Sequence, residues 1–138
     1  MKTRLLLDTC AVIWMAGGES LGAEATIAID EAFTRGESLR VSAITAWELG
    51  LLSRRGRLPL TQPPHLLYQE LIASDGIEEV AASSGVLLDS SFLPEGLHND
   101  PADRIIIATA RAHDLTIVTS DKLILDYARS GHVRALAC

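Results

Sequence analysis

Short, mostly apolar runs alternate along this chain with longer segments in which apolar residues recur at helical spacing. Runs this short have the length of buried strands and not of helices. We therefore expect strands over residues 4–7, 39–42, 77–81, 115–119 and 133–136. Because most of these runs are continuously apolar instead of alternating, they are typical of a parallel sheet that is covered on both faces.

Helical spacing and capping residues predict what connects the strands. We expect helices over residues 21–35, from Ser42 or Thr45 to about 54, and over 65–73, 83–88, 100–113 and 122–129. The pair Asp100-Pro101 combines a capping side chain with a proline in the first turn. Strands that alternate with helices predict an α/β protein, a three-layer α/β/α domain with a mostly parallel central sheet. Neither side of the proline loop at 59–64 has enough strands for its own sheet, so residues 1–138 are expected to form a single domain.

Composition excludes several classes of protein. The 138 residues are 48% hydrophobic and 22% charged, which is typical of a globular protein and not of a disordered or collagen-like one. Cys10 and Cys138 are the only cysteines, too few for a disulfide framework, and this favours a reducing cytoplasm. The sequence has no secretory signal and no apolar run of the roughly 20 residues that a membrane span needs. We therefore expect a cytoplasmic protein with no membrane partner.

Four carboxylates are expected at one edge of the sheet, where ligands of open parallel sheets bind. Asp8 follows the first strand, and Asp121 follows the strand at 115–119. Glu48 lies on the helix after the second strand, and Asp103 lies in the first turn of the helix that starts at Asp100. Taken singly, three of these acids have a structural explanation. Asp8 and Asp121 fit helix caps, and Asp103 fits an acidic partner of Asp100 in the first helical turn.

Glu48 is harder to explain as a structural residue. It is the only charged residue between Arg40 and Arg54, and its helical neighbours are apolar. A carboxylate on an apolar surface costs several kcal/mol unless it is paired. Asp103 likewise faces isoleucine and alanine side chains, and no lysine or arginine lies on either apolar stripe. We interpret the missing partner as a metal ion.

The ligand chemistry indicates which metal. Carboxylates that converge without bases raise one another's pKa, and a hard divalent cation relieves this conflict. All-oxygen ligation favours Mg²⁺ or Mn²⁺ over zinc, because zinc prefers the imidazole and thiolate that this edge is expected to lack. One or two such ions would activate water and stabilise charge on a phosphate, which indicates phosphodiester hydrolysis. Thr9, Thr119 and Ser120 are expected to supply hydroxyls near the metal ligands, where they could hold waters or the ligand oxygens in place.

Other features have two interpretations each. The basic cluster of Arg54, Arg55 and Arg57 fits phosphate contact and a solvated helix end about equally. Trp14 and Trp47, each within an apolar helical segment, are expected in the core rather than as base-stacking platforms.

Cys10 bears on two further chemistries. A haloacid-dehalogenase-type phosphatase would need an aspartate at position 10, where this chain has the cysteine. With no histidine or cation expected nearby to form a thiolate, we interpret Cys10 as a small buried side chain and not as a nucleophile.

Four motifs together resemble one known family. The first is Leu6-Leu7-Asp8-Thr9 followed by Trp14, and the second is Val41-Ser42 with Ala46-Trp47-Glu48-Leu49 and Gly56-Arg57-Leu58. The third is His98-Asn99-Asp100-Pro101-Ala102-Asp103-Arg104, and the fourth is Val118-Thr119-Ser120-Asp121. In this order, and over residues 5–136, the chain resembles the PIN-domain nucleases, and in particular the VapC-type toxins of bacterial toxin-antitoxin pairs.

The resemblance implies a three-layer α/β/α fold and Mg²⁺- or Mn²⁺-dependent endoribonuclease activity on transfer RNA or other structured RNA. It implies that Asp8, Glu48, Asp103 and Asp121 form an acidic quartet, with Asp8 and Asp103 as the principal metal ligands and Asp100 as a helix cap. It also implies a homodimer and a cognate antitoxin whose tail fills the acidic groove. The chain departs from the family pattern at position 10, where histidine is frequent, and at position 102, where an aromatic residue is usual; neither departure removes a carboxylate.

The leading hypothesis is therefore a metal-dependent ribonuclease toxin. Two alternatives stay open: a non-catalytic docking protein of the same fold whose acidic groove binds a basic partner, and a metal-dependent phosphatase. The chain has 18 acidic and 12 basic residues and a net charge of -6, which by itself argues against binding nucleic acid. Two divalent ions would bring this charge to -2, from -6 plus 4, so RNA binding is expected to strengthen when metal is added.

Overall fold

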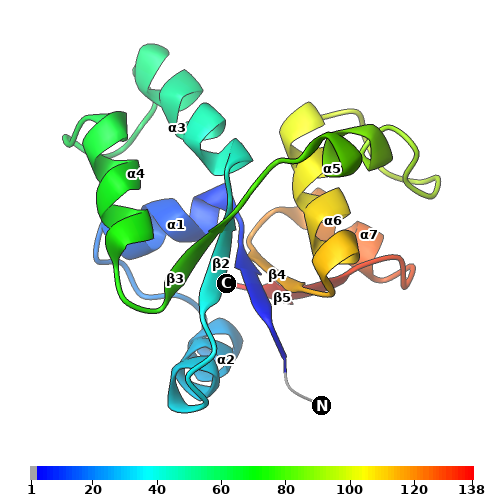
Figure 1. The fold of residues 1–138 in the computed structure, drawn as a ribbon, viewed down its shortest axis with the longest axis horizontal. Coiled ribbons are helices and arrows are strands. Elements are labelled where there is room, and N and C mark those ends of the chain that lie inside the picture. The colour runs from blue at the N-terminus through cyan, green and yellow to red at the C-terminus, as the bar shows by residue number, and fades with distance from the viewer. Residues whose placement is uncertain (1–2) are drawn as a thin grey trace.

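The computed structural model describes residues 3–138, in which five strands alternate with seven helices (Figure 1). The strands are β1 (Leu5–Leu7), β2 (Leu39–Ser42), β3 (Ile77–Val80), β4 (Thr116–Thr119) and β5 (Arg134–Ala137). The helices are α1 (Thr9–Ala16), α2 (Ala23–Thr34), α3 (Ile44–Arg54), α4 (Pro64–Ala73), α5 (Ser84–Asp89), α6 (Pro101–His113) and α7 (Lys122–Ala128).

The five strands form one sheet in the order β3-β2-β1-β4-β5, and every neighbouring pair is parallel. The prediction of a mostly parallel sheet is therefore confirmed, and the sheet is parallel throughout the described residues. The central strand is β1, whose Leu6 lies opposite Arg40 of β2 and Ile117 of β4. Because β1 has neighbours on both edges and helices on both faces, its three leucines are fully buried.

Helices cover both faces of the sheet and complete the three layers. Figure 1 shows α1, α2 and α4 on one side, and α5, α6 and α7 on the other. Leu5 and Leu7 contribute to the core under the first group, and Leu6 to the core under the second. Successive side chains of a strand point to opposite faces, so one short apolar run supplies both cores. Each buried leucine contributes about 1.5–3 kcal/mol through removal from water.

The start and end of helix α1 were not predicted from the sequence. The prediction was only that Trp14 lies in an apolar helical segment. The helix begins directly after β1, and its cap is Asp8, the residue that ends the strand. The side chain of Trp14 is partly buried, whereas that of Trp47 is 50% exposed. The prediction that Trp47 lies in the core is therefore wrong, because it shares α3 with Leu49 but points to the opposite side, and Leu49 is the buried one.

The two helix starts with predicted caps differ in outcome. The hydroxyl of Ser42 accepts a hydrogen bond from the amide of Ile44 at 3.2 Å. The cap position of α3 is nevertheless Ala43, which has no capping side chain, and Thr45 lies inside the helix, so the prediction of Ser42 or Thr45 as the cap is wrong. The carboxylate of Asp100 accepts from the amide of Asp103 at 3.0 Å, ahead of Pro101 in the first turn of α6. Within residues 3–138, none of the helices combines the length and the apolar character needed to cross a bilayer.

Candidate active site

The strand order reverses between β1 and β4, because the chain builds outward to β2 and β3 on one side and to β4 and β5 on the other. In open parallel sheets this reversal leaves a crevice at the carboxyl ends of the strands. Asp8 ends β1 there, with its amide bonded to the carbonyl of Val118 on β4 at 3.0 Å. Asp121 follows β4 at the same edge and caps α7.

Asp8 is a helix cap and part of the acidic site at once. Its Oδ1 accepts from the amide of Thr9 at 2.8 Å, and its Oδ2 accepts from the hydroxyl of Thr119 at 2.7 Å. The residue is only 5% exposed. Burial raises the pKa of Asp8, the hydrogen bonds from Thr119 and Thr9 oppose this, and the nearby charge of Asp121 adds to the rise.

Glu48 lies one turn into α3, on the side that faces Asp8. Its Oε1 accepts from the hydroxyl of Thr9 at 2.5 Å, and the same hydroxyl lies 3.1 Å from that of Thr45. Burial raises the pKa of Glu48 to about 7, and the charges of Asp8 and Asp103 contribute to the rise. No basic side chain of residues 3–138 pairs with Glu48, which agrees with the expectation of an unpaired carboxylate.

Asp103 has a partner that the sequence analysis did not identify. Its Oδ2 lies 2.7 Å from Nε2 of His98, which belongs to the loop before α6. Burial raises the pKa of Asp103 to about 6, although the hydrogen bond to His98 lowers it, and the charges of Asp100, Asp121 and Asp8 raise it further. The expectation that Asp103 lacks a partner is therefore wrong, because a histidine instead of a lysine or arginine supplies one.

Asp121 also combines two roles. Its Oδ1 accepts from the amides of Leu123 and Ile124 at 2.8 and 3.3 Å, as a helix cap does. Its charge also raises the pKa values of Asp8 and Asp103, so it belongs to the same electrostatic cluster. The charges of the four predicted acids are thus linked through Asp8 and Asp103, and their shared role as metal ligands stays a prediction.

The three predicted hydroxyls do not behave alike. Those of Thr9 and Thr119 contact Glu48 and Asp8, as described above. Ser120 uses its amide instead, which donates to Sγ of Cys10 at 3.5 Å; its side chain makes no hydrogen bond within residues 3–138.

A thiol and an imidazole do lie at this edge, contrary to the expectation used against zinc. Sγ of Cys10 is 3.7 Å from Oδ2 of Asp8, and His98 contacts Asp103. Neither residue was predicted at the site, because neither is spaced from a second cysteine or histidine as metal ligands usually are. The sequence did hold two indications: Cys10 lies two residues after Asp8, and His98 lies five residues before Asp103. Thr45, which contacts Thr9, was foreseen only as a helix cap.

The donor chemistry of the site suits a hard divalent cation. In the part of the chain that the structure describes, no three His, Cys, Asp or Glu side chains are gathered closely enough to hold an ion as they stand. The carboxylates nevertheless raise one another's pKa, and a bound cation would remove the repulsion that causes this. Oxygen donors dominate the cluster, which fits Mg²⁺ or Mn²⁺ better than zinc.

The arginine cluster lies apart from the acids. Arg54, Arg55 and Arg57 are all exposed at the far end of α3, and Arg54 is about 9 Å along the helix axis from Glu48 at the usual rise per residue. None of the three takes part in the ion pairs found among residues 3–138.

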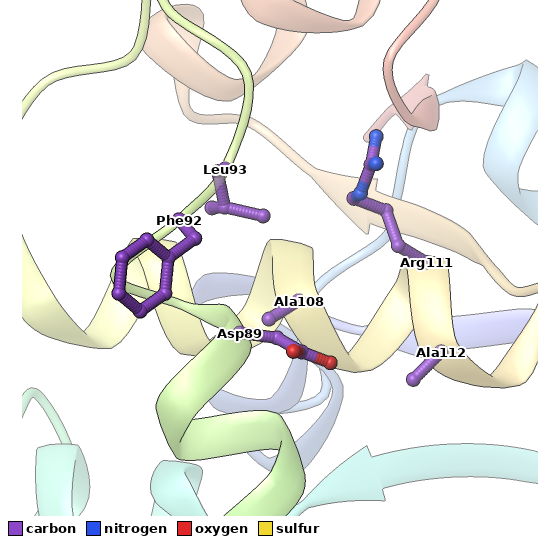
Figure 2. Close-up of a pocket in the computed structure, with 6 residues that line it drawn as sticks. All are labelled: Asp89, Phe92, Leu93, Ala108, Arg111 and Ala112. Carbon is purple, nitrogen blue, oxygen red and sulfur yellow. The ribbon is translucent and has the colours of Figure 1, made fainter.

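A separate hollow opens beside the second half of α6 and contains none of the four acids. Figure 2 shows its lining, with Ala108, Arg111 and Ala112 on α6 and with Asp89, Phe92 and Leu93 at and after the end of α5. Asp103 occupies the first turn of α6, at the other end of the helix. The hollow is therefore distinct from the acidic site.

Comparison with known proteins identifies the family of this chain. The family model described as the PIN domain matches residues 5–130. The chain belongs to the PIN-domain family. A curated relative in this family, Ribonuclease VapC22 of Mycobacterium tuberculosis (strain ATCC 25618 / H37Rv), is 36% identical over 125 residues, which cover 88% of this chain and 89% of the relative. The family predicted from the four motifs is thus confirmed.

Solved structures show the same PIN-domain fold. The structure of VapBC2 from Rickettsia felis bound to a DNA fragment from their promoter contains a chain that matches with a TM-score of 0.69 at 14% identity, over 98% of each chain. DNA-bound VapBC from Salmonella typhimurium matches with a TM-score of 0.67 at 16% identity, again over 98% of each chain. FitAcB from Neisseria gonorrhoeae matches with a TM-score of 0.55 at 24% identity, over 96% of each chain.

Proposed function

We propose that this PIN-domain protein is a metal-dependent endoribonuclease and the toxin of a type II toxin-antitoxin pair. The observation that carries the proposal is the cluster of Asp8, Glu48, Asp103 and Asp121 at the crevice between β1 and β4, in which burial and mutual repulsion raise the pKa values. The 36% identity to a protein named as a ribonuclease supports the reaction class.

Asp8 and Asp103 are the proposed principal ligands of Mg²⁺ or Mn²⁺, with Glu48 and Asp121 completing the site. The bound metal would supply activation of water and stabilisation of negative charge on the phosphate. The protein supplies the arrangement of the carboxylates. Thr119 holds one oxygen of Asp8 and Thr9 holds one oxygen of Glu48, which leaves Oε2 of Glu48 without a hydrogen bond from the described residues and available to the site.

Recognition of the substrate and of an antitoxin is part of the same proposal. The arginines at the end of α3 are exposed and suitable for contact with RNA phosphates beyond the acids. Because the solved structures that match this chain include a toxin-antitoxin complex from Klebsiella pneumoniae, we propose a cognate antitoxin partner for this chain as well. A homodimer is proposed from the family resemblance alone. Structured RNA, including transfer RNA, is the proposed substrate class.

Cleavage of end-labelled structured RNA by the purified protein tests the reaction. We expect cleavage in Mg²⁺ or Mn²⁺, none after chelation, and products with a 5′-phosphate and a 3′-hydroxyl. Asp103→Asn is expected to lose at least about 100-fold in rate, because it removes a charged ligand while keeping the shape of the side chain. Asp30→Asn, on the exposed face of α2, is the matched control. Cleavage by Asp103→Asn at the wild-type rate would refute the proposal.

A further inference from the structure

His98 is fixed in the protein by a contact network of its own. The guanidinium of Arg104 donates to the carbonyl of Ser90 at 2.9 Å and to that of His98 at 3.1 Å. Arg104 lies in the first turn of α6, next to Asp103. The network therefore ties both ends of the loop at 90–98 to the turn that carries Asp103, and it delivers the imidazole to that carboxylate.

The second ring nitrogen of His98 shows which atom donates the hydrogen bond. Nδ1 is buried and makes no hydrogen bond to any of residues 3–138. A buried N–H without an acceptor costs more than an unused lone pair, so the proton is assigned to Nε2. Nε2 then donates to Oδ2 of Asp103 at 2.7 Å. The imidazole acts as an oriented donor held in one tautomer.

The hydrogen bond from His98 determines which oxygen of Asp103 is free to bind a metal ion. One carboxylate oxygen is occupied by His98, and the amide of Asp103 is occupied by Asp100 at 3.0 Å. Oδ1 is the oxygen left to face the other acids. Hydrogen-bonded partners behind metal ligands fix their orientation, and their loss typically costs about 10- to 100-fold in metal affinity or activity.

We infer that His98 is a positioning residue, which orients Asp103 so that Oδ1 binds the divalent cation; this inference rests on the proposed metal-dependent function. His98 stands in one of the four sequence motifs but had no predicted role. Its contribution is geometric, and His98 itself is not placed among the groups that touch metal or RNA.

The test measures Mn²⁺ affinity, from the paramagnetic resonance signal of free Mn²⁺, beside kcat and KM for RNA cleavage. His98→Phe keeps a ring without a donor and is expected to weaken Mn²⁺ binding about 10- to 100-fold and to lower kcat with little change in KM. His98→Gln places a donor near the position of Nε2 and should restore most of the affinity, whereas His98→Asn, whose amide reaches only the position of Nδ1, should not. His113→Gln, exposed at the opposite end of α6, is the matched control.

The outcomes separate this inference from the proposed function. Equal Mn²⁺ affinity and kcat for wild type and His98→Phe would overturn the inference while leaving the nuclease standing. A wild type that cleaves no RNA but binds Mn²⁺ at least tenfold more tightly than His98→Phe would support the inference and refute the nuclease. If His98→Phe does not fold, the Gln and Asn variants give the same comparison, and equal Mn²⁺ affinity for the two would overturn the inference.

Discussion

The hydroxyl of Thr9, in the first turn of α1, donates to Oε1 of Glu48 on α3 at a distance of 2.5 Å. This contact joins the segment after β1 to the helix after β2, across 39 positions of sequence. A hydrogen bond to the ionised carboxylate lowers its pKa, whereas burial raises it, and burial is the larger effect at Glu48. Thr9 therefore limits how far the pKa of Glu48 rises.

Thr9→Val is expected to raise the pKa of Glu48 above its value of about 7, because burial stays while the hydrogen bond is lost. At pH 7 a larger fraction of Glu48 is then protonated, so Mn²⁺ affinity and cleavage should fall several-fold and recover toward pH 9. Full pH-rate profiles measure this shift. Thr26→Val, on the exposed part of α2, should leave the profile unchanged. Superimposable profiles for Thr9→Val and wild type would contradict the prediction.

The metal-free protein should be less stable at pH 8 than at pH 5. The pKa of Glu48 is raised to about 7 in the folded state, so the folded protein binds the proton more tightly than the unfolded chain, whose pKa is near 4.5. The stability that Glu48 contributes is fully present below about pH 4.5 and is lost as the pH rises through 7, by roughly 3 kcal/mol in all. Urea unfolding with chelator at both pH values measures the difference. In Glu48→Gln the free energy of unfolding should change much less between pH 5 and pH 8. An equal change in Glu48→Gln and in the wild type would contradict the prediction.

Substitutions at Asp100 and Asp103 should have different effects, because Asp100 is a helix cap and Asp103 is a proposed metal ligand. Asp100→Ala removes the cap of α6 and is expected to cost about 1 kcal/mol of stability. Its rate should fall only moderately, since Asp103 remains. Asp103→Asn should show the reverse, with cleavage lost and stability of the metal-free protein kept or increased, because a buried charge is removed. Chemical denaturation and RNA cleavage on the same preparations compare them; equal loss of rate in both variants would contradict the assignment.

Arg104→Met should release the loop at 90–98 without removing an acid. The substitution removes the hydrogen bonds from the guanidinium to the carbonyls of Ser90 and His98. Their loss is expected to lower the free energy of unfolding by about 1–3 kcal/mol in total. Hydrogen exchange in the loop should accelerate, and Mn²⁺ affinity should fall because His98 is no longer held. Arg129→Met is the control, since the only partner of the Arg129 side chain among residues 3–138 is Asp126, in an exposed ion pair. A loop that exchanges as slowly as in the wild type would show that other contacts hold it.

RNA affinity should depend on divalent metal. With a net charge of -6 and four acids in one cluster, the metal-free protein repels the phosphate backbone. Ca²⁺, in place of the cleavage-supporting ions, is expected to strengthen binding of a structured RNA at constant ionic strength. Fluorescence anisotropy with and without chelator measures this. Affinity that is unchanged by chelator would mean that binding relies on other surfaces, such as the arginines of α3.

Much of the fold could be predicted because its signals are local. The short apolar runs gave strand bounds close to those of the sheet, and Asp100-Pro101 marked the start of α6. Helix α1 was not bounded because its cap, Asp8, also ends β1, so no loop separates the two elements. The exposure of Trp47 was mispredicted because an apolar helical segment does not show which of its sides meets the sheet.

The sequence by itself determined the α/β class and the PIN-domain family, and it identified four candidate carboxylates, two that follow strands and two that lie on helices. Only the tertiary structure decided which groups surround those carboxylates. Thr9 reaches Glu48, Thr119 reaches Asp8 across 111 positions, and His98 reaches Asp103 instead of solvent. The reason is that residue type and local spacing fix periodicity and caps, whereas a hydrogen bond between distant segments depends on the strand order that brings them together.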